Sequence, residues 1–180
     1  MTGTGIEILD STASVSLNLV TIDGDAGVTT GLLLDDSGSP GTTDPSLTVT
    51  NSTLTGSADD WTGISINLVN DGTVSVSDTL IVGTTGTDQI GFEFVVDGGG
   101  TATPTAGLAL DDNTITLGGL TPLAVSLSAS NGGLINPLSG AGNLATDGTV
   151  DLIGGELIDA NGTEASISGT LEINSATVFP

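Results

Sequence analysis

The chain has 180 residues, of which 22 are Asp or Glu, and it contains no Lys, Arg, His or Cys, so its formal charge is −22. Without basic side chains it has no patch that could neutralise phosphates, and we expect neither nucleic acid nor an anionic membrane as a partner. Without His or Cys, the commonest general base, the thiolate nucleophile and the usual zinc ligands are also missing. The 37% of hydrophobic residues is enough for a folded core.

Apolar residues alternate with small polar residues along the chain, with the period of two that is typical of half-buried β-strands. In chain order, the alternating positions are Val15, Leu17 and Leu19; Leu47 and Val49; Ile64, Ile66 and Leu68; Val74 and Val76; Phe92, Phe94 and Val96; Ile115 and Leu117; Leu123, Val125 and Leu127; and Ile167, Leu171 and Ile173. Turn-forming pairs such as Asp71-Gly72, Asp97-Gly98 and Asn161-Gly162 separate these runs. About a dozen short strands with frequent turns predict an all-β fold, either a β-sandwich or a jelly roll.

The domain organisation is predicted to be a single all-β domain over residues 1–180. Gly31–Asp36 resembles Gly107–Asp112, which leaves open an internal duplication into two related lobes, about 1–85 and 86–180. No short repeat of fixed period, of the solenoid kind, stands out. No apolar run of about 18 residues is present either, so we expect no membrane insertion.

The carboxylates gather in pairs on Gly-rich stretches, and no internal cation offsets them. Oxygen ligands of this kind are what calcium selects, and close like charges either stay hydrated or collect a metal ion. Calcium is therefore the expected cofactor, although Asp-Gly and Asp-Asp pairs also form ordinary turns. The candidate ligands are Asp23, Asp25, Asp35, Asp36, Asp44, Asp59, Asp60, Asp111, Asp112, Asp147 and Asp151.

Catalysis is not expected. Paired carboxylates can hydrolyse glycosides, but glycosidase clefts orient sugars with aromatic and basic side chains, and the aromatic content here is 2%. Trp61 is expected to anchor the core together with Phe92 and Phe94. The alternative function is a calcium-dependent adhesin or carbohydrate-binding module, whose site would be the Asp35 to Asp44 loop and the Trp61 region. A flat Thr-rich ice-binding surface is a further option.

A strand-rich, acidic chain that offers trypsin-like proteases no cleavage site suits an extracellular location. In about 0.5 M salt the screening length falls to about 4 Å, so like-charged copies can approach one another. Two alternating segments, Ala13–Ile22 and Thr170–Phe179, lack the Lys or internal Pro that normally protects an edge strand. They are the candidates for strand addition between copies of the chain.

The alphabet of Gly, Thr, Ser, Asp and Val, with stretches such as Asn70–Ser77 and Ser166–Ile173, resembles that of bacterial surface-layer and surface-appendage proteins. It is most similar to subunits of the tubular spinae of marine proteobacteria. This resemblance implies a structural protein at the cell surface or outside the cell, whose partners are copies of itself. The expected function is a subunit of an extracellular filament, tube or surface layer, stabilised by divalent cations.

Overall fold

The computed structural model describes residues 3–36, 45–98, 104–111, 113–117, 123–130, 133–137, 150–151, 159–161 and 173–174. These residues form three sheets of six, five and six strands, which we name sheets A, B and C. Sheet A contains β1 (Gly3–Leu9), β4 (Val28–Asp35), β7 (Thr62–Leu68), β10 (Ile90–Asp97), β13 (Leu123–Ser130) and β16 (Asp159–Asn161). Sheet B contains β2 (Ser14–Asn18), β5 (Ser46–Thr50), β8 (Gly72–Ser77), β11 (Thr105–Asp111) and β14 (Leu134–Pro137). Sheet C contains β3 (Thr21–Gly24), β6 (Thr53–Gly56), β9 (Leu80–Gly83), β12 (Thr114–Leu117), β15 (Val150–Asp151) and β17 (Ile173–Asn174).

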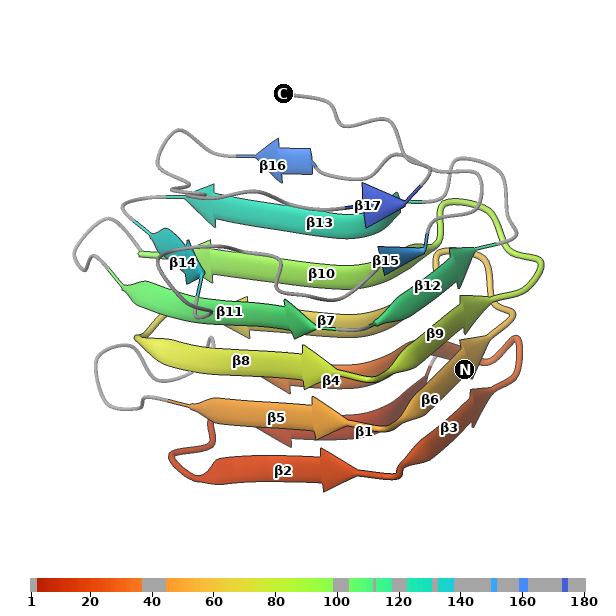
Figure 1. Cartoon of the computed structure of the whole chain (residues 1–180), viewed down its shortest axis with the longest axis horizontal. Helices are drawn as coiled ribbons and strands as arrows, with labels where there is room; N and C mark the ends of the chain where they lie inside the picture. The colour runs from red at the N-terminus through yellow and green to blue at the C-terminus, as the bar shows by residue number, and fades with distance from the viewer. Residues whose placement is uncertain are drawn as a thin grey trace.

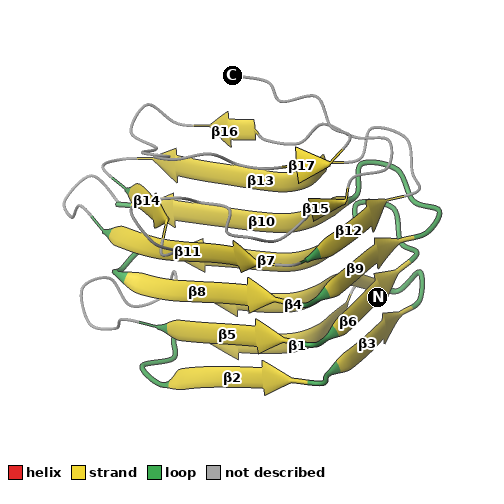
Figure 2. Ribbon diagram, viewed as in Figure 1, coloured by secondary structure: helices red, strands yellow, loops and turns green. Residues whose placement is uncertain are grey.

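The chain passes from sheet A to sheet B to sheet C and then returns to sheet A one step further along (Figure 1). We call each such circuit a coil. Every described strand pair is parallel, and each strand lies beside its counterparts in the neighbouring coils. The all-β expectation therefore agrees with the structure, but the β-sandwich or jelly roll is wrong, because those folds are built from antiparallel strands. The described part of the chain is a parallel β-solenoid, drawn entirely as strands and loops in Figure 2.

Coil length varies, which is why the sequence shows no fixed period. In sheet A, Ile6 pairs with Leu32, Leu32 with Ile64, Ile64 with Phe92 and Phe92 with Val125. These steps are unequal because the connections between strands differ in length, whereas the paired strands stay in register apart from a shift between Gly3 and Thr4.

The two segments that resemble each other in sequence, Gly31–Asp36 and Gly107–Asp112, do not belong to equivalent strands. Gly31–Asp35 lies in β4 of sheet A, whereas Gly107–Asp111 lies in β11 of sheet B. The described strands form one continuous stack of coils, and the duplication into two related lobes stays a prediction. The extent of the domain, residues 1–180, stays a prediction.

The corner from sheet B to sheet C always has two residues in the first three coils. Leu19, Asn51 and Asp78 are the first residues of these corners, and all three have a positive φ, of 57°, 48° and 48°. Asn and Asp tolerate this left-handed conformation, whereas Leu does so poorly. The expectation that Leu19 continues the strand of Val15 and Leu17 is wrong, because the chain turns at Leu19, whose side chain is 75% exposed.

Glycines stack at one level of sheet A, where a side chain would collide with the backbone of the next coil. A Cβ atom on Gly31 would lie 2.6 Å from the carbonyl oxygen of Gly63, and one on Gly63 would lie 2.5 Å from that of Gly91. Gly5 lies in the same way against Gly31. Each of these glycines directly precedes the first inward apolar residue of its strand, so glycine followed by two alternating apolar residues marks β1, β4, β7 and β10, whereas β13 has Ala124 at this position.

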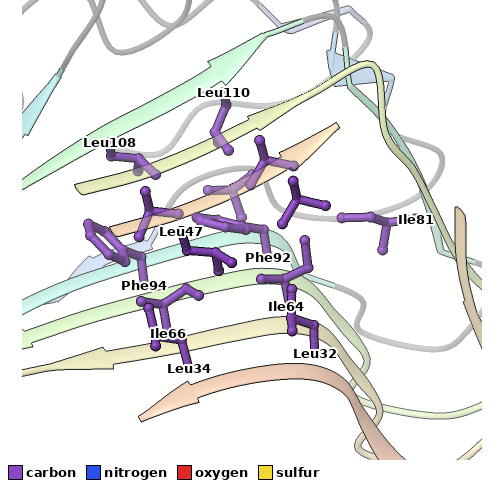
Figure 3. Close-up of a cluster of buried hydrophobic side chains, with 14 of the residues drawn as sticks. Leu32, Leu34, Leu47, Ile64, Ile66, Ile81, Phe92, Phe94, Leu108 and Leu110 are labelled. Carbon is purple, nitrogen blue, oxygen red and sulfur yellow. The ribbon is translucent and has the colours of Figure 1, made fainter. Parts of the chain in front are cut away.

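The core fills the space between the three sheets. Side chains from all three sheets point toward one another there, among them Leu34, Leu47, Ile81 and Phe94 (Figure 3). Trp61, Phe92 and Phe94 are each 0% exposed, which confirms their expected role in the core. The described part of the chain contains no helix long and apolar enough to cross a membrane.

Candidate functional site

Of the predicted carboxylates that the structure describes, Asp23 and Asp25 line a common pocket. The pocket has a volume of about 240 Å³ and lies where sheet C turns back to sheet A. Its other lining residues are Gly24, Thr55, Gly56, Ser57 and Thr84. The Asp23 Oδ1 accepts a hydrogen bond of 2.8 Å from the Thr55 hydroxyl, and the Asp25 Oδ1 accepts one of 2.8 Å from the Gly27 N–H. Two carboxylates and three hydroxyl groups therefore line this pocket, and such oxygen atoms are the ligands that hard cations prefer.

Asp35 and Asp36 are adjacent in sequence but lie in different environments. Asp35 ends β4 and is half-buried, whereas the side chain of Asp36 is 0% exposed. The Asp36 Oδ2 accepts a hydrogen bond of 2.6 Å from the amide nitrogen of Asn70 in the next coil. A buried carboxylate requires such a partner, so Asp36 has a structural role at the corner between sheets A and B.

Asp59 and Asp60 connect two successive corners between sheets C and A. The Asp59 Oδ1 accepts a hydrogen bond of 3.1 Å from the Thr87 N–H, and the Asp60 N–H donates one of 2.9 Å to the Thr87 carbonyl. Asp60 also has a positive φ of 56°, and Asp88 repeats it at the equivalent position with 52°. These contacts explain both residues as turn formers.

The remaining predicted ligands are spread along the chain. Asp111 ends β11 and Asp151 ends β15, in sheets B and C, while Asp44, Asp112 and Asp147 lie outside the described residues. Within the described ranges, no group of three or more His, Cys, Asp or Glu side chains is placed to hold one metal ion. Those of the eleven carboxylates that the structure describes therefore do not form one site, and among them Asp23 and Asp25 line a common pocket.

Sequence reasoning missed a row of buried polar residues at the corner between sheets B and C. Ser52, Thr79 and Asn113 follow one another in successive coils and are 3%, 1% and 2% exposed. The Asn113 Oδ1 accepts a hydrogen bond of 3.1 Å from the Thr79 N–H, while its amide nitrogen donates one of 2.8 Å to the Val76 carbonyl. The sequence does mark this row, because a pair of polar residues follows each alternating run: Asn51-Ser52, Asp78-Thr79 and Asp112-Asn113.

The outer face of sheet B is uncharged over its first three strands. We call this set of outward side chains the hydroxyl face: Ser14, Ser16, Asn18, Ser46, Thr48, Thr50, Thr73, Ser75 and Ser77. The register runs without interruption from β2 to β5 and from β5 to β8, so these side chains form straight rows. Among them, the Thr73 hydroxyl donates a hydrogen bond of 3.0 Å to the Ser46 Oγ. The rows expected of an ice-binding surface are thus built mainly from Ser, and that function stays a prediction.

Comparison of the chain with family models, curated proteins and solved structures gave no match. Its function is therefore argued from the arrangement described above.

Proposed function

We propose that this chain is a structural subunit of an extracellular assembly, a filament, tube or surface layer, in which copies bind one another. The observation that supports this most is the stacking of coils through in-register parallel ladders. In a solenoid each coil contacts only its neighbours, so the body lengthens by the addition of further coils. Such a rod supplies length and stiffness, which a filament or wall requires.

The charge of the chain fits the same proposal. All 22 charged side chains are carboxylates, so copies repel one another at low ionic strength and approach when salt screens them. Side-chain ion pairs between copies are excluded by composition. Contacts between copies must therefore come from apolar burial, backbone hydrogen bonds and bound cations. An extracellular medium that is salty and rich in calcium supplies the conditions for them.

Calcium is the cofactor of the proposal, and the pocket at Asp23 and Asp25 is its best-supported position within the described residues. The two carboxylates and the hydroxyl groups of Thr55, Ser57 and Thr84 supply oxygen donors there. This pocket also favours the alternative, a calcium-dependent adhesin or carbohydrate-binding module. That alternative loses its sugar-stacking residue, because Trp61 is 0% exposed and cannot offer its ring to a ligand.

Sedimentation and negative-stain microscopy of the purified chain test the proposal. At about 0.5 M salt with calcium, where the screening length is about 4 Å, we expect ordered assemblies that grow with protein concentration. A chelator should shorten or dissolve them, and Asp23→Asn together with Asp25→Asn should reproduce the effect of the chelator. A chain that stays monomeric at high concentration under these conditions is not a polymer subunit. If such a monomer shifts on addition of a glycan in calcium, the adhesin is the better description.

A further inference from the structure

The first coil, β1 with β2 and β3, ends all three sheets on one side. These strands pair with β4, β5 and β6, and within the described residues no strand lies on their other side. An edge strand presents unpaired backbone N–H and C=O groups to whatever strand can reach it. Figure 1 shows the three edges together at the red end of the stack.

The inward side chains of the first coil are half-covered. Their in-register counterparts in the second coil, among them Leu32, Leu34 and Leu54, are each 1% exposed. The first-coil residues pack on the core from one side and are only partly buried. This apolar end is made of Ile6, Ile8, Val15, Leu17 and Ile22.

Residues 3–24 lack two of the usual devices that protect an edge strand, Lys and Pro, and the described irregularity of β1 is a register shift between Gly3 and Thr4. The carboxylates Glu7 and Asp23 alternate with the inward residues and are exposed on the outer faces. No carboxylate therefore lies among the five inward side chains, although the chain as a whole carries a charge of −22.

We propose that the first coil is the surface on which a second copy of this chain stacks. The inference rests on the proposed function and names the contact that joins the copies. An occupant has to pair with three edges that face different directions and cover five apolar side chains at the same time. A three-sided coil of the same cross-section meets both requirements, and the chain itself shows the fit, because its second coil covers the other side of the first in that manner.

The expected strand segment Ala13–Ile22 takes a precise form in this contact. It is not one uninterrupted strand, since it turns at Leu19 and Val20 and supplies both β2 and β3. Both strands are nevertheless edge strands. Of the other expected segment, Thr170–Phe179, the described residues are Ile173 and Asn174 in β17, and the proposal does not depend on them.

Two adjacent substitutions in β2 provide a matched test. Leu17→Asp places a carboxylate on the apolar end, and Ser16→Asp places the same charge on the outer face of the same strand. In sedimentation at high salt with calcium, we expect Leu17→Asp to raise the protein concentration for half-assembly by at least about tenfold, and Ser16→Asp by less than about twofold. Fluorescence of the single, buried Trp61 reports whether each variant keeps its fold.

Amide hydrogen exchange of the unmodified chain gives a second measurement that does not depend on a variant folding. On passing from dilute monomer to assembly, exchange in β1, β2 and β3 should slow by at least about tenfold, while that in β7 and β8 should change little. If assemblies form but the first coil gains no protection, or Leu17→Asp assembles like Ser16→Asp, copies bind elsewhere and this inference fails while the proposed function stands. If the chain forms no assemblies at all, the proposed function itself fails.

Discussion

The first and third coils have the same three-strand plan, yet they differ in how completely they are buried. In the third coil, Ile64, Ile66 and Val74 are 0% exposed, with a coil on each side. In the first coil, Ile8 and Val15 occupy equivalent inward places and are only half-covered. The same residue types in the same pattern are therefore core in one coil and available surface in another. Position in the stack decides this, and the sequence pattern alone does not.

The largest effect should come from Leu47→Ala compared with Leu17→Ala, two leucines that point inward from neighbouring strands of sheet B. Leu47 is 1% exposed, and its truncation should lower the free energy of unfolding by about 2–5 kcal/mol. Leu17 is half-covered, so its truncation should cost about 1–2 kcal/mol. Urea unfolding of the monomer at low protein concentration measures both values. Equal losses would mean that the first coil is as well buried as the second.

A somewhat smaller loss of unfolding free energy is expected for Gly63→Ala in the glycine stack. Its Cβ atom would lie 2.5 Å from both the Gly91 carbonyl oxygen and the Ile81 Cγ2, so the coils would have to shift, at a cost of about 1–3 kcal/mol. Gly3→Ala is the matched control at the open edge, where the nearest atom is 3.7 Å away. Thermal unfolding compares the two variants, and a neutral Gly63→Ala would show that the coils can separate there at little cost.

Truncation of Asn113, which belongs to the row of buried polar residues between sheets B and C, should lower the free energy of unfolding by a similar or smaller amount. Asn113→Ala leaves the Thr79 N–H and the Val76 carbonyl without their side-chain partner, which should cost about 1–3 kcal/mol. Asn18→Ala serves as the comparison, because Asn18 is exposed and its Oδ1 accepts hydrogen bonds from Thr50 and Asn51 at the surface. That change should cost less than about 1 kcal/mol. If chemical denaturation shows the same loss of unfolding free energy for both variants, the row of buried polar residues has no special role in stability.

The smallest expected effect is an increase in the free energy of unfolding. Leu19→Asn places at the first corner the residue type that the second coil already uses at Asn51, where φ is 48°. Relief of the left-handed strain at Leu19 should raise the free energy of unfolding by about 0.5–1 kcal/mol. Leu80→Asn, at a partly exposed strand residue without positive φ, should bring no such gain. The melting temperatures of the two variants decide whether backbone strain or loss of an exposed leucine is responsible.

The strands were predictable from sequence, but their pairing was not. Alternation correctly located β7, β8 and β10 through residues such as Ile64, Val74 and Phe92, because inward and outward positions differ in hydrophobicity. The same alternation occurs in parallel and antiparallel sheets. Asp71-Gly72 was predicted to be a turn between strands, and the chain does turn there, but the turn leads from sheet A into sheet B and joins strands that do not pair.

The candidate site was predictable only in part, for a similar reason. Asp23 and Asp25 are close in sequence, so their common pocket follows from local chain geometry. The separation of Asp35 from Asp36 depends on Asn70, which belongs to the next coil. A contact between coils of unequal length leaves no fixed spacing in the sequence. The open end of the first coil is likewise a property of the stack, although its inward residues were visible as an alternating run.

The two-residue corners join sheets B and C at the same place in each of the first three coils, whereas the route from sheet A to sheet B is short after β7 and longer after β4. Variation in chain length is thus absent from the border between sheets B and C and occurs at the other two borders, since the connection from sheet C to sheet A has three residues after β3 and six after β9. Foreign peptides inserted into the connections at these two borders would lengthen a connection and leave the strand ladders in place. The molecule thereby offers a scaffold in which inserted peptides and the supporting strands occupy different parts of each coil.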